Sequence, residues 1–143
     1  MTTFTVLGTP KPQGSKRAFI NPRSGRPIVV ESAGPSLQDW RTNVQQAAIS
    51  AHKGPPLEGP VRVTMKFGLQ RPKSHPKTRE TWPTTRPDID KLVRGVLDAI
   101  THVCFNDDSQ VTELLAFKHY GTPGVMVIVE DARGEQRRDR QEE

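Results

Sequence analysis

Cysteine is almost missing from this sequence, which contains only Cys104. A single cysteine excludes an intrachain disulfide and is typical of proteins from reducing compartments. The sequence also has no apolar run long enough to form a transmembrane helix. Met1–Phe4 lacks the charged and apolar regions of a signal peptide. We therefore expect a cytoplasmic protein that does not enter a membrane.

Several common catalytic motifs are missing as well. The segment Gly8–Arg17 is rich in glycine, proline and cations, but it lacks the Gly-Lys-Ser/Thr ending of a nucleotide-binding P-loop. The four histidines do not have the spacing of zinc ligands and have no cysteine partners, so we interpret them as structural or surface residues. No Gly-x-Ser-x-Gly element is present. We expect no nucleotide cofactor.

Hydrophobic residues are scarce, at 33% of the 143 residues, and the net charge is +5. Much of the apolar deficit lies in polar segments, especially after Asp131. This distribution predicts one domain over residues 1–131 and a charged, disordered tail over residues 132–143. The positive charge favours a polyanion as partner, although a solubilising surface would produce the same excess.

Hydrophobic periodicity predicts an α+β fold with two helices. One helix begins at Ser36 and buries a stripe that includes Trp40, and the other covers about residues 89–100. Alternating or β-branched patterns predict the strands Thr3–Leu7, Ala18–Asn21, Pro27–Val30, Val61–Leu69, Val111–Tyr120 and Val125–Val129, with a turn at Gly121–Gly124 between the last two. This order predicts a small mixed β-sheet covered by two helices.

Aspartates flank the second predicted helix. Asp88 and Asp90 lie at its start, and Asp107 and Asp108 follow shortly after its end. Carboxylates that converge in a basic protein suit a divalent metal ion and phosphate chemistry. Each pair alone also has a structural explanation, because aspartate favours helix N-termini and turns. The helix is ~18 Å long, and the segment after it spans at most about 23 Å. Asp108 can therefore return to Asp88 and Asp90, unless a second subunit supplies the missing carboxylate.

Residues 70–86 form a long polar connection, here called the basic arm, that leads into this acidic helix start. Its cations are Arg71, Lys73, Lys77, Arg79 and Arg86. Connections of this length are usually functional or disordered. A basic arm beside carboxylates would hold a phosphate backbone, and a solvated loop is the alternative. Trp82 in the arm either anchors it to the body of the protein or packs on a base.

At these residues the sequence resembles the RusA family of Holliday junction resolvases, which is found in bacteria and their phages. The matching pattern runs Arg86-Pro87-Asp88-Ile89-Asp90, continues with Leu97-Asp98-Ala99 and ends with Asp107-Asp108-Ser109-Gln110-Val111. Gly8–Arg17, with the cations Lys11, Lys16 and Arg17, and the basic arm also suit the family as DNA-binding segments. The order of elements is similar to the family's mixed α/β fold, which forms a homodimer.

The resemblance implies an endodeoxyribonuclease that uses Mg²⁺, or Mn²⁺ in its place, to resolve four-way DNA junctions in recombination and repair by paired phosphodiester hydrolysis. It also implies that Asp88, Asp90 and Asp108 are the essential carboxylates that hold the metal, with Asp107 as a close neighbour.

The sequence departs from the family pattern at two positions. The family usually has Asn directly after the second Asp and a catalytic Lys three residues later, where this sequence has Lys91 and Arg94. Arg94 can stabilise charge on the phosphate but does not readily donate a proton. Lys91 is the alternative for that role.

Two other functions are considered: a metal-dependent nuclease that acts on flaps or other branched DNA, and a non-catalytic DNA-binding module. The complete set of aspartates argues against the second function. The sequence does not distinguish the first function from the resolution of four-way junctions, because selectivity among branched substrates depends on dimer geometry.

Overall fold

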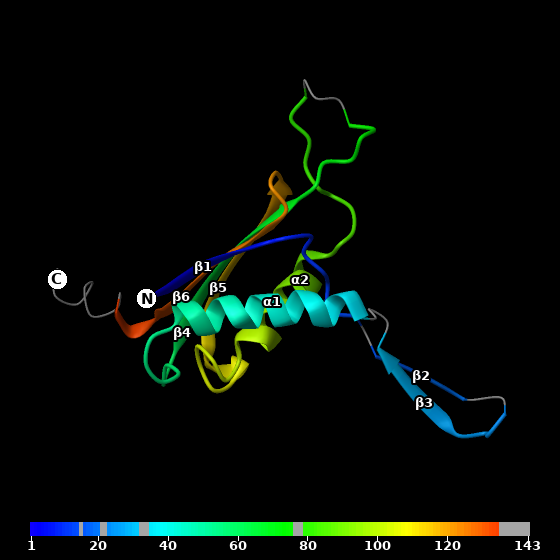
Figure 1. The fold of residues 1–143 in the computed structure, drawn as a ribbon, viewed down its shortest axis with the longest axis horizontal. Helices are drawn as coiled ribbons and strands as arrows, with labels where there is room; N and C mark the ends of the chain where they lie inside the picture. Colours follow the sequence, from blue (N-terminus) through cyan, green and yellow to red (C-terminus); the bar gives the residue numbers. More distant parts are fainter. Residues whose placement is uncertain (15, 21–22, 32–34, 76–78, 135–143) are drawn as a thin grey trace.

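The computed structural model describes residues 1–14, 16–20, 23–31, 35–75 and 79–134 (Figure 1). The elements run β1 (Thr2–Leu7), β2 (Lys16–Ile20), β3 (Pro27–Glu31), α1 (Pro35–Ala51), β4 (Val61–Leu69), α2 (Ile89–Ile100), the 3₁₀ turn η1 (Asp108–Gln110), β5 (Val111–Tyr120) and β6 (Gly124–Asp131). A four-stranded mixed sheet and two helices confirm the predicted α+β class.

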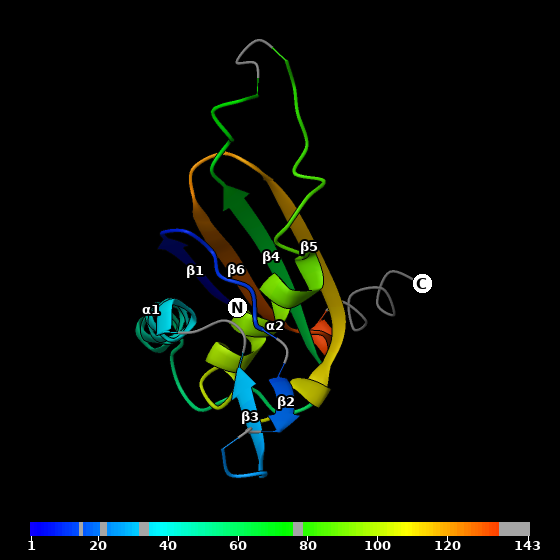
Figure 2. The same ribbon diagram turned by 90° about the vertical axis from the view of Figure 1, so that its right-hand side faces the viewer.

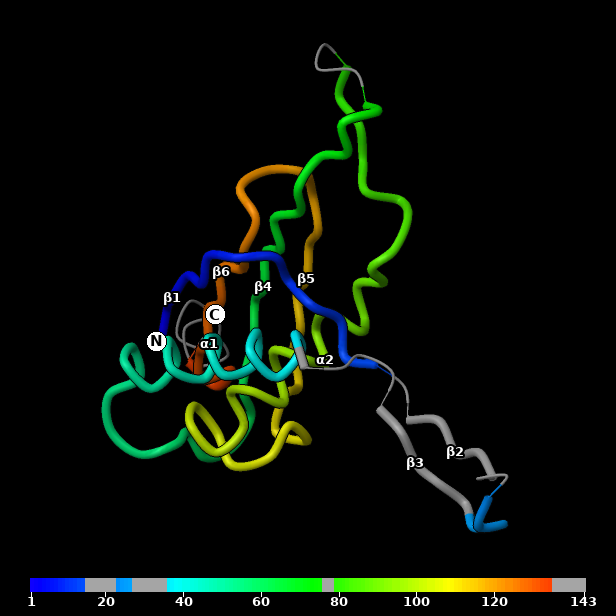
Figure 3. Tube along the Cα trace, turned by 45° about the vertical axis from the view of Figure 1, so that its right-hand side comes forward, coloured from blue at the N-terminus to red at the C-terminus, as the bar shows by residue number. Residues whose placement is uncertain are grey.

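The main sheet has the strand order β1-β6-β4-β5. Strand β6 is antiparallel to β1 and to β4, whereas β4 and β5 are parallel. Parallel neighbours need a crossover connection, and here the crossover consists of the basic arm and α2. Figure 2 shows α2 in front of the sheet, and Figure 3 shows the arm leaving the end of β4 and returning to the start of α2. The crossover therefore carries both the cations of the arm and the first aspartates.

The hydrophobic core lies between one face of this sheet and the two helices. Alternate residues of β4, including Val63, Met65 and Phe67, are fully buried in this core. Helix α1 contributes Trp40 and Val44, and α2 contributes the buried residues Leu92, Val93, Gly95, Val96, Ala99 and Ile100. The period of two in the strands and the helical spacing in α1 and α2 produce these apolar faces.

The strands β2 and β3 form a separate antiparallel pair, which confirms the predicted hairpin. Figure 1 shows this pair projecting from the body of the molecule, away from the main sheet. Arg23 and Arg26 in its turn are exposed.

The connection from β5 to β6 lies where a turn is predicted, but it does not close a β-hairpin. Strand β4 lies between β5 and β6, so the connection crosses the end of β4. The Gly121 N–H donates a hydrogen bond of 3.0 Å to the Leu69 carbonyl. A Cβ atom on Gly68 would lie 2.0 Å from the Thr122 carbonyl oxygen, so only glycine leaves room for this crossing.

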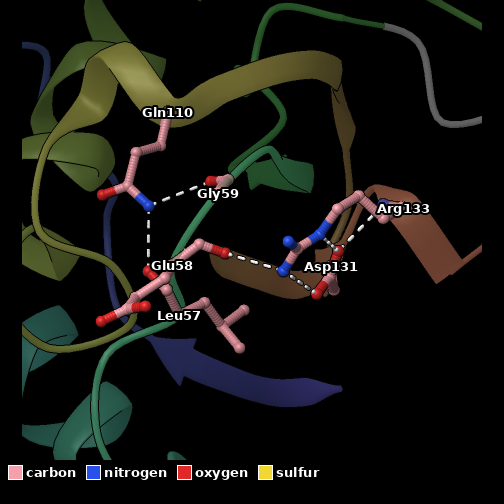
Figure 4. A network of polar contacts seen from close by, with 6 residues as sticks. All are labelled: Leu57, Glu58, Gly59, Gln110, Asp131 and Arg133. Carbon is pink, nitrogen blue, oxygen red and sulfur yellow. Dashed lines mark hydrogen bonds and ion pairs between the residues drawn. The ribbon is translucent and has the colours of Figure 1, made fainter.

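The predicted tail begins with residues that pack against the domain. Ala132 is buried, and its N–H donates to the Pro60 carbonyl at 3.0 Å. Arg133 pairs with Asp131 at 3.0 Å and donates to the Glu58 carbonyl at 3.2 Å (Figure 4). Residues 135–143 lie outside the described residues. Within the described part of the chain, no helix combines the length and apolar character that crossing a membrane requires.

Candidate active site

The start of α2 carries two of the predicted site residues. Asp88 is the N-cap residue, and Asp90 lies in the first turn. The Asp88 side chain makes no capping hydrogen bond, and one of its oxygens lies 3.7 Å from Lys91 Nζ. Helix capping, the structural explanation for an aspartate at this position, therefore does not account for the Asp88 side chain.

The segment Asn106–Gln110, here called the carboxylate turn, uses its two aspartates differently. Asp107 Oδ1 accepts a hydrogen bond of 2.9 Å from the Ser109 N–H and forms a capping box with Gln110. This backbone hydrogen bond from Ser109 is the main cause that lowers the pKa of Asp107. Asp107 therefore stabilises the turn through these hydrogen bonds. Asp108 is the next residue, and both aspartates are exposed.

A tight bend after α2 returns the carboxylate turn to the domain. His102 has a positive φ of 73°, and its N–H donates to the Phe105 carbonyl at 2.6 Å. Cys104 and Phe105 are fully buried, and burial raises the pKa of the Cys104 thiol to about 11. Cys104 is therefore a packing residue of the core.

A cavity of about 440 Å³ between α2 and β5 brings three predicted site residues together. Asp90, Arg94 and Asp108 line it, with the apolar residues Ile89, Val93, Leu97, Leu114 and Ala116. We call it the α2–β5 cavity. Two carboxylates and a guanidinium at the edge of an apolar cavity can bind a hydrated cation and a phosphate group side by side. Asp88 and Lys91 do not line this cavity.

A second cavity, of about 320 Å³, also borders the carboxylate turn. Its lining residues are Arg41, Asp98, Thr101, His102, Asn106, Asp107 and Asp108. Asp108 therefore borders both cavities. Among the described residues of one chain, no group of three or more histidine, cysteine, aspartate and glutamate side chains is arranged to hold a metal ion.

The predicted DNA-binding cations occupy two regions. In the basic arm, Lys73, Arg79 and Arg86 are exposed, whereas Arg71 is half-buried and donates a hydrogen bond to the Arg79 carbonyl. Lys77 lies outside the described residues. Trp82 is 65% exposed, which argues against a buried anchor for the arm.

The other predicted cations lie in or near the loop after β1. The loop crosses α2, where the Gln13 N–H donates to the Lys91 carbonyl at 2.9 Å. A Cβ on Gly95 would lie 3.3 Å from the Lys11 carbonyl oxygen, so the helix has a glycine where the loop passes. Lys16 and Arg17 belong to β2, and their side chains lie outside the described part.

Three residues of the site region received no role from the sequence. Arg41 reaches the second cavity from α1. Gln110 and Lys118 make hydrogen bonds to main-chain groups of distant segments. No sequence pattern predicts the contacts of these three residues. Gln110 does lie within the Asp107–Val111 motif, but the motif does not indicate its partners.

Comparison with known proteins identifies the family of the chain. Residues 9–130 match the family described as Endodeoxyribonuclease RusA. The uncharacterized protein YqaN of Bacillus subtilis (strain 168) is 32% identical over 139 residues, which cover 90% of this chain and 94% of that protein. This match indicates an endodeoxyribonuclease, a hydrolase that cuts within DNA strands. The chain belongs to the RusA family, as its aspartate pattern predicted.

Proposed function

We propose that this protein is a Mg²⁺-dependent endonuclease that resolves four-way DNA junctions in recombination or repair. Membership of the RusA family supports the nuclease activity and the junction substrate. The observation that carries the catalytic assignment is the meeting of Asp90, Asp108 and Arg94 at the α2–β5 cavity. Asp90 and Arg94 lie one turn apart on α2, whereas Asp108 comes from the carboxylate turn, and neither helix capping nor the carboxylate turn explains why Asp108 meets them.

The donor set of this cavity fits Mg²⁺. This ion usually binds through one or two carboxylates and completes its shell with water and substrate phosphate oxygens. Asp90 and Asp108 would supply the two carboxylates. Asp88 would add a third, either when DNA binds or from a second subunit. When bound, Mg²⁺, or Mn²⁺ in its place, would activate water and neutralise charge that develops on the phosphate.

The basic residues near the cavity have separate tasks. The Arg94 guanidinium would bind non-bridging phosphate oxygens and stabilise their charge, and it keeps its proton throughout. Lys91 is the alternative cation, because its ammonium group lies beside Asp88. The exposed cations of the basic arm would hold the DNA backbone next to the cavity.

We also propose that the protein acts as a homodimer. Resolution requires two symmetric cuts, and a two-fold axis would place one cavity at each cleaved strand. The apolar sides of Val61–Leu69 and Val125–Val129 are buried in the core, so these sides do not offer surface to a partner subunit. The exposed Leu115 and Phe117, at 51% and 46%, offer apolar surface on the opposite face of the sheet for a partner subunit.

Cleavage of labelled DNA tests the activity. The substrates are a synthetic four-way junction, a flap and a linear duplex, each with and without Mg²⁺. We expect the wild type to cut the junction only with Mg²⁺, and we expect Asp90→Asn to bind the junction without cutting it. Asp39→Asn, which removes an exposed carboxylate on α1, should cut normally.

Three results would contradict the proposal. Near-normal cleavage by Asp90→Asn would remove this residue from the mechanism. A preference for the flap would favour a nuclease for other branched DNA. Binding of the junction by the wild type without cleavage would favour a non-catalytic module.

Sedimentation at low micromolar concentration tests the homodimer, followed by mixing of wild type with excess Asp90→Asn. Mixed dimers should leave many junctions nicked on one strand only. A monomer whose full resolution is undiminished by the variant would contradict the dimer.

A further inference from the structure

We propose that Gln110 and Lys118 are positioning residues that hold the two aspartate-bearing segments in place beside the main sheet. Gln110 holds the carboxylate turn at the start of β5, and Lys118 holds the segment that leads into α2. The inference rests on the proposed function, because it concerns the metal-binding aspartates of that site. It adds two residues that do not line the α2–β5 cavity.

The Gln110 side chain uses its full hydrogen-bonding capacity. Its Oε1 accepts from the N–H groups of Asn106 and Asp107, both at 2.9 Å. Its Nε2 donates to the carbonyl oxygens of Leu57 and Gly59 at 2.9 and 3.0 Å (Figure 4). A primary amide offers two donor hydrogens and two acceptor lone pairs, and all four are satisfied here.

These four bonds join the carboxylate turn to residues 57–59, directly before β4. Residues 57–59 are fixed independently, because the Leu57 N–H donates to the Cys104 carbonyl at 2.8 Å and Arg133 holds the Glu58 carbonyl at 3.2 Å. Asp108 therefore lies in a turn that is bonded on both sides. The main-chain position of Asp108 at the cavity therefore depends on a side chain two residues away.

Lys118 has the corresponding place at the other aspartate segment. Its Nζ donates to the carbonyl oxygens of Thr85 and Pro87, both at 2.8 Å. These carbonyls directly precede Asp88 and the first turn of α2, which carries Asp90. Lys118 belongs to β5, the strand that Gln110 precedes. Lys118 therefore holds the segment that carries Asp90 to β5, and Gln110 holds the segment that carries Asp108 to residues 57–59.

Residues that orient metal ligands typically change metal affinity or activity by ~10–100-fold when they are removed. A residue that only stabilises the fold would lower the melting temperature and leave the Mg²⁺ dependence unchanged. The test therefore measures the Mg²⁺ concentration for half-maximal cleavage of a four-way junction, together with thermal stability.

The first variants change Gln110. Gln110→Met keeps the approximate size of the side chain and removes all four hydrogen bonds. We expect the half-maximal Mg²⁺ concentration to rise at least about tenfold, with metal-free junction binding unchanged. Amide hydrogen exchange at Asn106 and Asp107 should accelerate in the metal-free protein. Gln110→Glu keeps the acceptor for these two N–H groups and should show a smaller rise; it serves as the test if Gln110→Met does not fold.

The second variants change Lys118. Lys118→Met should lower the maximal cleavage rate or raise the Mg²⁺ requirement about tenfold, and Lys118→Arg, which keeps the donors, should restore part of the loss. Two control variants should stay within about twofold of the wild type. Lys53→Met removes an exposed lysine just after α1, and Lys66→Met removes an exposed lysine of β4.

The results distinguish the inference from the proposed function. Wild-type Mg²⁺ dependence in folded Gln110→Met and Lys118→Met would overturn the inference while the proposed function stands. Equal losses in Lys53→Met and Lys66→Met would also overturn it, since they would indicate an effect that does not depend on the Gln110 and Lys118 contacts. A wild-type protein that does not cut the junction would overturn the proposed function, and the inference with it.

Discussion

The basic arm allows a quantitative prediction about DNA binding. Lys73 and Arg79 are its exposed cations on either side of the tip, whereas Arg71 also braces the arm through the Arg79 carbonyl. Changing Lys73 and Arg79 to Gln therefore removes charge without removing that brace, which uses a main-chain oxygen. If both residues contact phosphates, the slope of log affinity against log salt should become less steep by about 1.8, at about 0.9 per contact.

The size of this effect is measurable. When salt rises from 50 to 200 mM, both proteins lose affinity for DNA. With a slope difference of about 1.8, the fold loss of the variant should be about twelvefold smaller than the fold loss of the wild type. Fluorescence anisotropy of a labelled four-way junction without divalent metal gives both slopes. A control variant with Lys53→Gln and Lys66→Gln removes the same charge from exposed positions outside the arm.

The two outcomes that would refute this reasoning are distinct. An unchanged slope for the Lys73 and Arg79 variant would show that the arm is a solvated loop. An equal change in the control variant would show that net charge, and not contact between the arm and DNA, determines the slope.

Two further predictions concern the fold. The buried Cys104, with its pKa raised to about 11, should not react with a thiol reagent at pH 8 until the protein unfolds, and rapid labelling of the native protein would contradict its burial. Gly68→Ala should lower the free energy of unfolding by about 1–3 kcal/mol in urea titrations, because its Cβ would clash with the Thr122 carbonyl. Gly121→Ala meets no atom within 4 Å and should cost less, so equal midpoints for both variants would contradict the crossing at Gly68.

Local patterns predicted the secondary structure well, and long-range pairing was not predictable from them. The helical spacing from Ile89 to Ile100 gave α2, and the alternation from Val61 to Leu69 gave β4, with the observed bounds. The position of β4 between β5 and β6 depends on the crossover through the arm, and no local residue pattern encodes it. The glycine and proline of the β5–β6 connection therefore suggested a turn without showing what it crosses.

The site shows the same division between local and distant information. The family resemblance implied Asp88, Asp90 and Asp108 as metal ligands with Asp107 as a neighbour, but only hydrogen-bond geometry shows that Asp107 caps η1. The contacts of Gln110 were also not predictable from the sequence, because its distant partners are main-chain carbonyls. Carbonyl groups are present at every residue and leave no signature in the amino-acid sequence.

The position of the basic arm within the parallel crossover has an evolutionary consequence. Hydrogen bonds hold both ends of the arm. Gly121 bonds to the Leu69 carbonyl at one end, and Lys118 bonds to the Pro87 carbonyl at the other. Doubling the length of a flexible loop between fixed ends costs only about 0.6 kcal/mol. Insertions and deletions at the tip of the arm should therefore be tolerated while the aspartates keep their places. Lineages would thus be able to alter the reach of the protein along DNA by changing one loop, without altering the residues that perform hydrolysis.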